Sequence, residues 1–275
     1  MVARFLLALL LALAFRAAAE TIRFPSATWP PTILQQERMP PMQTIAETAS
    51  VPITGELYRP AGNGPFPAVV LLPPCGNLAR EVQEAEAARY RALGYALFVV
   101  DSYGPRGIAD GCTGTQAGGS VDLVMDAYGA LLHLATLSSI DAERIAIVGY
   151  SRGATAVLAS VLYDGPERLF DRGFRAAVAY SPACEGAVAD LGVPTLIFSA
   201  GLDEMNPPRW CRTIMQRRRK LGPEPRLVVY GGANHGFQID DVPRNFYGYR
   251  LTYDEAAARA AWAEVTALLR SAFGR

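Results

Sequence analysis

The sequence is poor in histidine and cysteine and has no excess of either charge. Its 275 residues include two histidines and four cysteines, and 26 basic residues balance 26 acidic ones. No basic run is long enough to indicate a nucleic-acid-binding surface; we interpret Arg217–Lys220 as the solvated end of a helix. No Cys-x-x-Cys or His-x-x-x-His spacing occurs, so the usual pattern of a zinc site is missing.

The sequence also lacks an apolar run long enough to cross a membrane. Phe5–Phe15 has eleven uncharged residues, whereas a spanning helix needs about 20. It follows the positively charged Arg4 and precedes Ala17-Ala18-Ala19, which offers an A-x-A cleavage site. We interpret residues 1–19 as a secretory signal peptide. The mature chain is then expected to begin near Glu20 and to be exported to the periplasm or the extracellular space, without a membrane span.

Export gives the cysteines a meaning, because disulfides form in oxidising compartments. Cys75, Cys112, Cys184 and Cys211 allow three pairings. We favour Cys75–Cys112 with Cys184–Cys211, because each bridge would join loops that follow strands at the same edge of a sheet. This pairing is a hypothesis that the sequence alone does not decide.

Apolar residues make up 51% of the chain and charged residues 19%, which is typical of a globular protein with a substantial core. Residues 20–50 are rich in proline and are predicted to wrap the surface, with one edge strand around Thr44–Ala49. From Val51 onward, short apolar runs alternate with helical patterns. This alternation predicts an α/β fold over residues 51–275: a doubly wound, mostly parallel sheet with helices on both faces.

The individual elements follow from these patterns. Strands are expected at 53–58, 68–72, 96–100, 145–148, 176–180, 195–199 and 227–230. Helices are expected at 81–93, 121–137, 154–162, 208–221 and 254–273.

The stretch Gly149-Tyr150-Ser151-Arg152-Gly153 joins a β-branched run to a helix-forming run. This is the G-x-S-x-G pattern of a nucleophile elbow in its strand–turn–helix context. The turn at Ser151 is sharp, and a side chain at either glycine would collide with neighbouring backbone. Ser151 would also lie at a helix N-terminus, which favours developing negative charge. We predict that Ser151 is a nucleophile.

A serine hydroxyl needs a base, and only two histidines are available. His133 lies within an apolar helical pattern and is expected to be structural. His235 lies in a loop after the last predicted strand, where sheets of this kind place catalytic groups. Asp203 follows another strand and is the candidate that orients the imidazole, with Glu204 as its nearest rival. The order Ser151, Asp203, His235 is that of α/β-hydrolases.

Hydrolysis of an ester creates an oxyanion that two backbone N–H groups must stabilise. One is expected from Arg152, directly after the nucleophile. The other is expected from the loop after strand 68–72; Pro73 and Pro74 have no N–H, so Cys75 is the first residue able to donate, with Gly76 next.

These motifs resemble the dienelactone hydrolase family of α/β-hydrolases, in its exported branch. The similarity rests on Gly149–Gly153, Gly201-x-Asp203 and Asn234-His235-Gly236-Phe237, and on Cys75-Gly76 with Asp101-Ser102-Tyr103-Gly104-Pro105-Arg106-Gly107 before Cys112. The founding members use a cysteine nucleophile where this chain has Ser151. The resemblance implies hydrolysis of an ester or lactone, with no metal or organic cofactor.

Arg106, Arg152 and Tyr150 are candidates for substrate binding, because arginines bind carboxylates through paired hydrogen bonds. We favour the alternative in which Arg106 anchors its loop and Arg152 starts a helix and points to solvent. Asp101 is expected to cap the following loop or to hold Arg106.

The sequence therefore predicts a serine hydrolase acting on a small ester or lactone through an acyl-enzyme on Ser151. An acyltransferase or peptidase on the same fold remains an alternative, as does a binding protein without catalysis.

Overall fold

The computed structural model describes residues 19–29, 50–109, 111–112, 121–240 and 245–274. The predicted signal peptide and the predicted edge strand at Thr44–Ala49 lie outside these residues.

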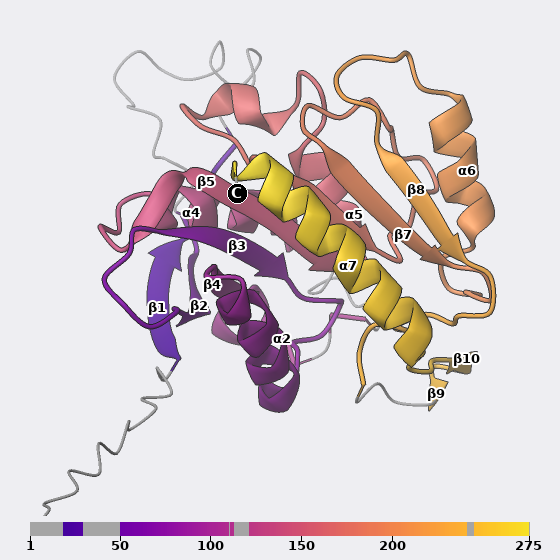
Figure 1. The fold of residues 1–275 in the computed structure, drawn as a ribbon, viewed down its shortest axis with the longest axis horizontal. Helices are drawn as coiled ribbons and strands as arrows, with labels where there is room; N and C mark the ends of the chain where they lie inside the picture. The colour runs from indigo at the N-terminus through magenta and orange to yellow at the C-terminus, as the bar shows by residue number, and fades with distance from the viewer. Residues whose placement is uncertain (1–18, 30–49, 110, 113–120, 241–244, 275) are drawn as a thin grey trace, which may run out of the picture.

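Eight strands form one twisted sheet across the molecule (Figure 1). Their order is β1-β2-β4-β3-β5-β6-β7-β8, and every pair from β4 to β8 is parallel. β1 and β2 pair antiparallel at one edge. The strands are β1 (Glu20–Pro25), β2 (Pro52–Tyr58), β3 (Phe66–Leu72), β4 (Ala96–Asp101), β5 (Ile140–Tyr150), β6 (Ala177–Tyr180), β7 (Thr195–Ala200) and β8 (Arg226–Tyr230).

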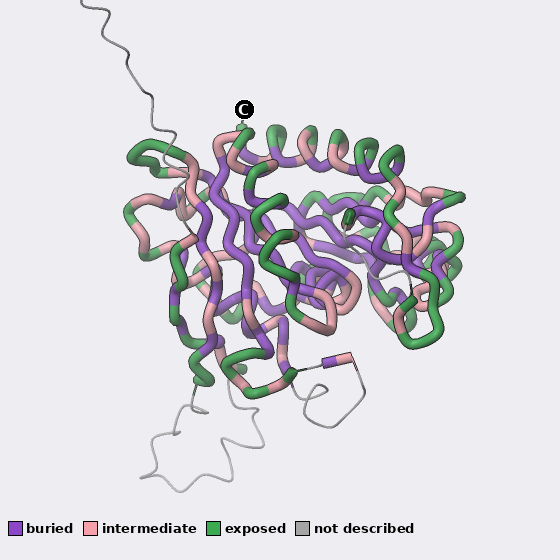
Figure 2. The backbone as a smooth tube through the Cα atoms, turned by 90° about the horizontal axis from the view of Figure 1, so that it is seen from below, coloured by how far each residue is buried: buried purple, intermediate pink, exposed green. Residues whose placement is uncertain are grey.

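Helices cover both faces of this sheet. One core cluster packs α4 (Leu123–Leu134), α5 (Arg152–Ser160) and α6 (Pro208–Gln216) against one face. The other packs α2 (Arg80–Ala92) and α7 (Glu255–Ala272) against the opposite face, and Figure 1 shows these two helices crossing in front of the strands. The inner strands are buried along most of their length, as the tube in Figure 2 shows. This arrangement confirms the predicted doubly wound α/β fold.

The first strand differs from expectation. Residues 20–25 were predicted to lie in a surface segment, but they form β1, paired with β2 from Glu20↔Leu57 to Pro25↔Pro52. Ile22 and Phe24 alternate with exposed residues and are buried against the sheet. Period-two alternation over only two apolar residues is a weak signal, and neighbouring prolines obscured it.

The arginine cluster after α6 is more ordered than predicted. Arg218 donates to the carbonyl of Ala189 at 2.9 Å, and its side chain is only 7% exposed. The backbone N–H and side chain of Arg219 both donate to Asp190. Arg218 and Arg219 therefore fasten the chain after α6 to a neighbouring loop, while Arg217, Arg219 and Lys220 are exposed, as predicted for a solvated helix end.

Short elements complete the described fold: the turns η1 (Gly104–Arg106) and η2 (Pro166–Leu169), and a hairpin of β9 (Asn245–Phe246) and β10 (Tyr249–Arg250) before α7.

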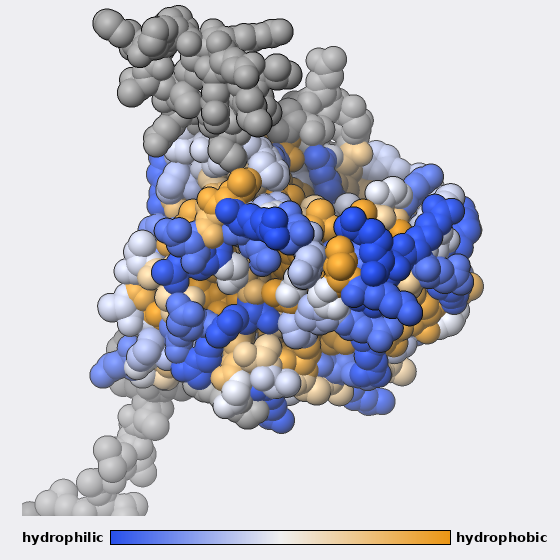
Figure 3. All heavy atoms as spheres, turned by 90° about the horizontal axis from the view of Figure 1, so that it is seen from above, coloured by the Kyte–Doolittle hydropathy of each residue, from blue (hydrophilic) through white to orange (hydrophobic). Residues whose placement is uncertain are grey.

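Within the described residues, no helix combines the length and apolar character that a membrane span requires. The face seen in Figure 3 intersperses hydrophilic residues with small hydrophobic areas.

Candidate active site

The turn at Ser151 has the geometry of a nucleophile elbow. Ser151 links β5 to α5 with a φ of 53°, which a residue with a side chain rarely adopts. A Cβ on Gly149 would lie 2.4 Å from the carbonyl oxygen of Gly153, and one on Gly153 would lie 2.3 Å from that of Pro73. Both glycines are therefore required by close backbone contact, as the sequence predicted.

His235 and Asp203 form a buried pair. The imidazole Nδ1 lies 2.7 Å from Asp203 Oδ2, and the two side chains are 7% and 0% exposed. The other carboxylate oxygen, Oδ1, accepts from the backbone N–H groups of Met205 and Asn206 at 3.0 and 2.8 Å. These contacts fix the Asp203 carboxylate. Because Asp203 pairs with Nδ1, the second imidazole nitrogen, Nε2, is not engaged by this carboxylate. Glu204, the rival candidate, is exposed.

The loop that carries His235 is held by the segment before α7. His235 forms an isolated bridge with Leu251, Asn234 Nδ2 donates to Thr252 Oγ1 at 2.9 Å, and the N–H of Asp254 donates to the carbonyl of Phe237 at 3.0 Å. His133, which is predicted to be structural, lies on α4, where its ring centroid is 6.0 Å from that of Phe24.

Ser151 and His235 line the same cavity, which has a volume of about 580 Å³. Cys75, Gly76 and Tyr150 line it as well. The cavity thus brings together the predicted nucleophile Ser151, the predicted base His235 and the predicted oxyanion donor Cys75. They lie just after the carboxyl ends of β5, β8 and β3, respectively. Asp203 stands behind His235.

A disulfide holds the Cys75 loop against a second loop. Cys75 is bonded to Cys112, which also lines the cavity, and Cys184 is bonded to Cys211. This is the pairing that the sequence favoured. Gly111 lies so close that a Cβ there would meet the carbonyl oxygen of Cys75 at 2.4 Å.

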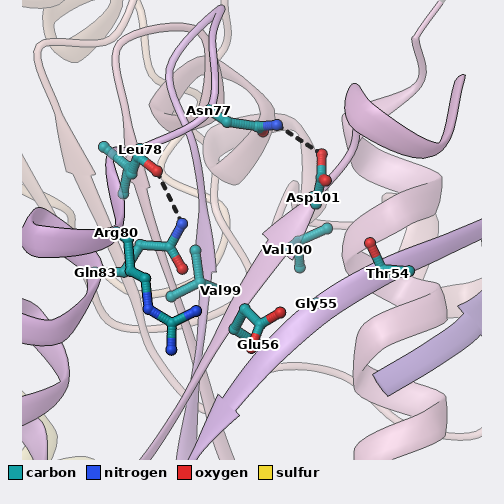
Figure 4. A pocket seen from close by; sticks show the side chains of 10 residues that line it. All are labelled: Thr54, Gly55, Glu56, Asn77, Leu78, Arg80, Gln83, Val99, Val100 and Asp101. Atoms are coloured by element: carbon teal, nitrogen blue, oxygen red, sulfur yellow. Dashed lines mark hydrogen bonds between the residues drawn. The ribbon is translucent and has the colours of Figure 1, made fainter. Parts of the chain in front are cut away.

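A smaller hollow of about 180 Å³ lies behind this loop, between β2, β4 and the start of α2. Its wall is fastened by two hydrogen bonds visible in Figure 4: Asn77 Nδ2 donates to Asp101 Oδ1 and Gln83 Nε2 donates to the carbonyl of Leu78, both at 2.8 Å. Asn77 and Leu78 line both hollows. None of the predicted catalytic residues lines the smaller hollow, and the Asn77–Asp101 bond ties the loop that carries Cys75 to the end of β4.

Arg106 does not face the cavity, so its assignment to substrate binding is wrong. Its guanidinium makes two hydrogen bonds of 2.8 Å with Asp126 of α4, which is fully buried, and a third with the carbonyl of Ser102. It is the loop anchor that the favoured alternative described. Asp101 caps the loop through the N–H groups of Tyr103 and Gly104, and it does not hold Arg106.

Arg152 begins α5, as expected, but its guanidinium is not directed only to solvent. Its Nη1 donates to the carbonyl of Gly111 at 3.0 Å and so connects the elbow to the Cys112 loop. Tyr150 lines the cavity, and its hydroxyl hydrogen-bonds to Glu86 of α2, which is 6% exposed. Burial raises the pKa of Tyr150, and the Glu86 carboxylate raises it further.

Two buried polar residues of the cavity, Ser181 and Gln238, were not predicted as site residues. Ser181 follows β6 with a φ of 50°, and Gln238 lies three residues after His235; both are more than nine-tenths buried. The Oγ of Ser181 and the Oε1 of Gln238 are buried without a hydrogen-bond partner in the described structure. A serine directly after a strand was the available signal for Ser181, whereas nothing in the local sequence marked Gln238.

The described residues contain no group of three or more histidine, cysteine or acidic side chains arranged to hold a metal ion.

Comparison with known families agrees with this geometry. Residues 53–273 match the model of the dienelactone hydrolase family. The chain belongs to this family. A search of curated proteins finds no match to this chain.

Solved structures share its fold. A putative dienelactone hydrolase from Klebsiella pneumoniae subsp. pneumoniae is 19% identical with a TM-score of 0.65, covering 92% of this chain and 98% of that one. The dienelactone hydrolase-like promiscuous phosphotriesterase P91 from metagenomic libraries is 18% identical with a TM-score of 0.64 over the same shares. Thermogutta terrifontis esterase 2, phosphorylated by paraoxon, is 16% identical with a TM-score of 0.61, covering 94% and 95%. Membership of the family supports a hydrolase that acts on small molecules, and the solved structures show the shared fold.

Proposed function

We propose that this protein is an exported serine esterase that cleaves a carboxylic ester or lactone through an acyl-enzyme on Ser151. The observation that carries the proposal is the 2.7 Å contact between His235 and the buried Asp203, beside a cavity that His235 shares with the strained Ser151. An orienting acid, a base and a nucleophile in one place are what ester hydrolysis requires.

In the proposed reaction, Ser151 Oγ attacks the ester carbonyl while His235 Nε2 accepts the hydroxyl proton. Asp203 keeps the proton of His235 on Nδ1 and stabilises the imidazolium. The backbone N–H groups of Arg152 and Cys75 stabilise the oxyanion. His235 then gives the proton to the leaving alkoxide. Water, deprotonated by His235, attacks the acyl-enzyme, and the imidazolium returns this proton to Ser151 Oγ as the acid is released.

Export is part of the proposal because two disulfides require an oxidising compartment during folding. It agrees with the signal-like pattern of residues 1–19. Expression with residues 1–19 intact should give a secreted protein that begins near Glu20, which N-terminal sequencing measures; retention of residues 1–19 would contradict export.

Paraoxon provides a direct test of the nucleophile, since it phosphorylates a structurally similar esterase. Mass spectrometry should find the adduct on Ser151, and Ser151→Ala should lower kcat for p-nitrophenyl acetate by about 10⁴-fold or more. Ser271→Ala, an exposed change on α7, is the matched control and should retain labelling and activity. Labelling at another residue, or full activity of Ser151→Ala, would overturn the mechanism.

A further inference from the structure

The walls of the cavity are apolar on two sides of Ser151. Leu78 and Val82 come from the start of α2 and the loop before it, whereas Ile239, Phe246 and Leu251 come from the His235 loop and the segment that follows. A volume of about 580 Å³ lies within the range of small-molecule sites. Such walls suit a substrate with an extended apolar body.

No lysine or arginine side chain contributes to the described lining. The two arginines that could have bound a substrate carboxylate have other partners: Arg106 binds Asp126, and Arg152 binds the carbonyl of Gly111. A substrate carboxylate would therefore lose its water against apolar walls, which is costly without a paired cation.

Glu86, an acidic residue next to the cavity wall, also disfavours binding of a substrate carboxylate. Glu86 is buried and shares a hydrogen bond with the hydroxyl of Tyr150, which lines the cavity. Arg89, on the next turn of α2, contacts Glu86 Oε1 at 3.2 Å and is directed to that carboxylate, not to the cavity. The guanidinium of Arg89 is thus already paired with Glu86 and is not available to a substrate.

Two polar atoms remain for recognition. Six residues of the described structure have a buried side-chain nitrogen or oxygen without a hydrogen-bond partner, and only Ser181 and Gln238 among them line the cavity. A buried carbonyl oxygen such as Gln238 Oε1 can only accept a hydrogen bond, and leaving it unpaired is costly. Both groups are uncharged. They fit a neutral hydroxyl of a ligand better than a carboxylate, which cannot donate to Gln238 Oε1.

Resting on the esterase assignment, we propose that the cavity selects an uncharged ester whose apolar chain carries a hydroxyl group. Gln238 is the specificity-determining residue that accepts from this hydroxyl, and Ser181 is the second polar contact. The preferred substrate is then uncharged, because its recognition uses two neutral groups in an apolar cavity.

A matched series of methyl esters tests the proposal: hexanoate, 3-hydroxyhexanoate, 6-hydroxyhexanoate and the half ester of adipate. Each kcat/KM is divided by the ester's rate of alkaline hydrolysis to remove differences in reactivity. One hydroxy ester should exceed hexanoate by about tenfold, the value of one hydrogen bond to an otherwise unpaired group. The adipate half ester should lie about 100-fold below hexanoate, because its carboxylate loses water without a paired cation.

Gln238→Leu separates the role of this residue from general packing. The variant should reduce the ratio between the preferred hydroxy ester and hexanoate from about ten to about one. Gln216→Leu, the same change at an exposed position on α6, should keep the ratio. In a complementary gain of function, Val82→Arg places a cation in the wall and should raise the relative rate of the adipate half ester.

Paraoxon labelling of Ser151 is measured on the same samples. If Ser151 is labelled but no hydroxy ester exceeds hexanoate, or the preference survives in Gln238→Leu, or adipate matches hexanoate, the substrate inference is wrong and the esterase stands. If Ser151 is not labelled and no ester is cleaved, the esterase assignment itself falls.

Discussion

The two disulfides have nearly the same geometry but very different surroundings. Their Cα–Cα distances are 4.8 and 4.9 Å, and they close loops of 37 and 27 residues. Cys184 and Cys211 are 2% and 0% exposed and belong to a hydrophobic core cluster. Cys75 and Cys112 are partly exposed and line the cavity. One bridge is part of the packing, whereas the other fixes two loops of the site.

Chain entropy predicts similar contributions from both bridges, about 3.5 to 4 kcal/mol of unfolding free energy each. We therefore expect removal of the two bridges to differ in its effect on kcat and not in its effect on the unfolding free energy. The Cys75 loop needs its bridge for catalysis because an oxyanion donor works only when it is held in place. The core bridge has no comparable contact with the cavity.

Among the tests of this comparison, the largest expected effect is the loss of kcat when the bridge at the cavity is removed. Cys75→Ser with Cys112→Ser should lower kcat for a neutral ester by about 100-fold or more, because the N–H of Cys75 loses its fixed position. Circular dichroism at the assay temperature establishes that the variant is folded. A kcat within threefold of the parent would show that the bridge does not position the oxyanion donor.

Removal of the core bridge should lower the unfolding free energy by a similar amount but leave kcat unchanged. Cys184→Ser with Cys211→Ser should lower the unfolding free energy by about 3.5 kcal/mol, measured by urea denaturation. Its kcat should stay within twofold of the parent at temperatures where it is folded. A loss of kcat comparable to that of the cavity bridge would remove the distinction between the two.

A smaller effect is expected at Arg152, which supports the Cys112 loop from the elbow. Arg152→Met removes the hydrogen bond to the carbonyl of Gly111 and should lower kcat by about tenfold, since one hydrogen bond to a charged group is lost. Arg212→Met, an exposed change on α6 beside Cys211, is the control and should leave kcat unchanged. Equal rates in both variants would show that the Gly111 contact is dispensable.

Local sequence predicted the elements that depend on local rules. The elbow, α2 and most buried strands were found close to their observed bounds, because apolar runs and glycine positions are read directly from the chain. The exceptions are β5, which begins at Ile140 and not at residue 145, and α6, which ends at Gln216 and not at residue 221. β1 was missed, since pairing with β2, and not its own pattern, makes it a strand. Gln238 was missed because only the packing around it leaves its Oε1 without a partner.

From Val51 onward, sequence alone determined the order of the sheet strands and their helices, the strand–turn–helix at Ser151 and the candidate base, because each follows from local geometry or from the scarcity of histidine. Tertiary structure decided which carboxylate meets which cation. Arg106 could have faced a substrate, but Asp126, 20 positions away on α4, occupies its guanidinium. Such choices depend on distances between elements far apart along the chain, and those distances exist only after the sheet and its two helical layers have packed.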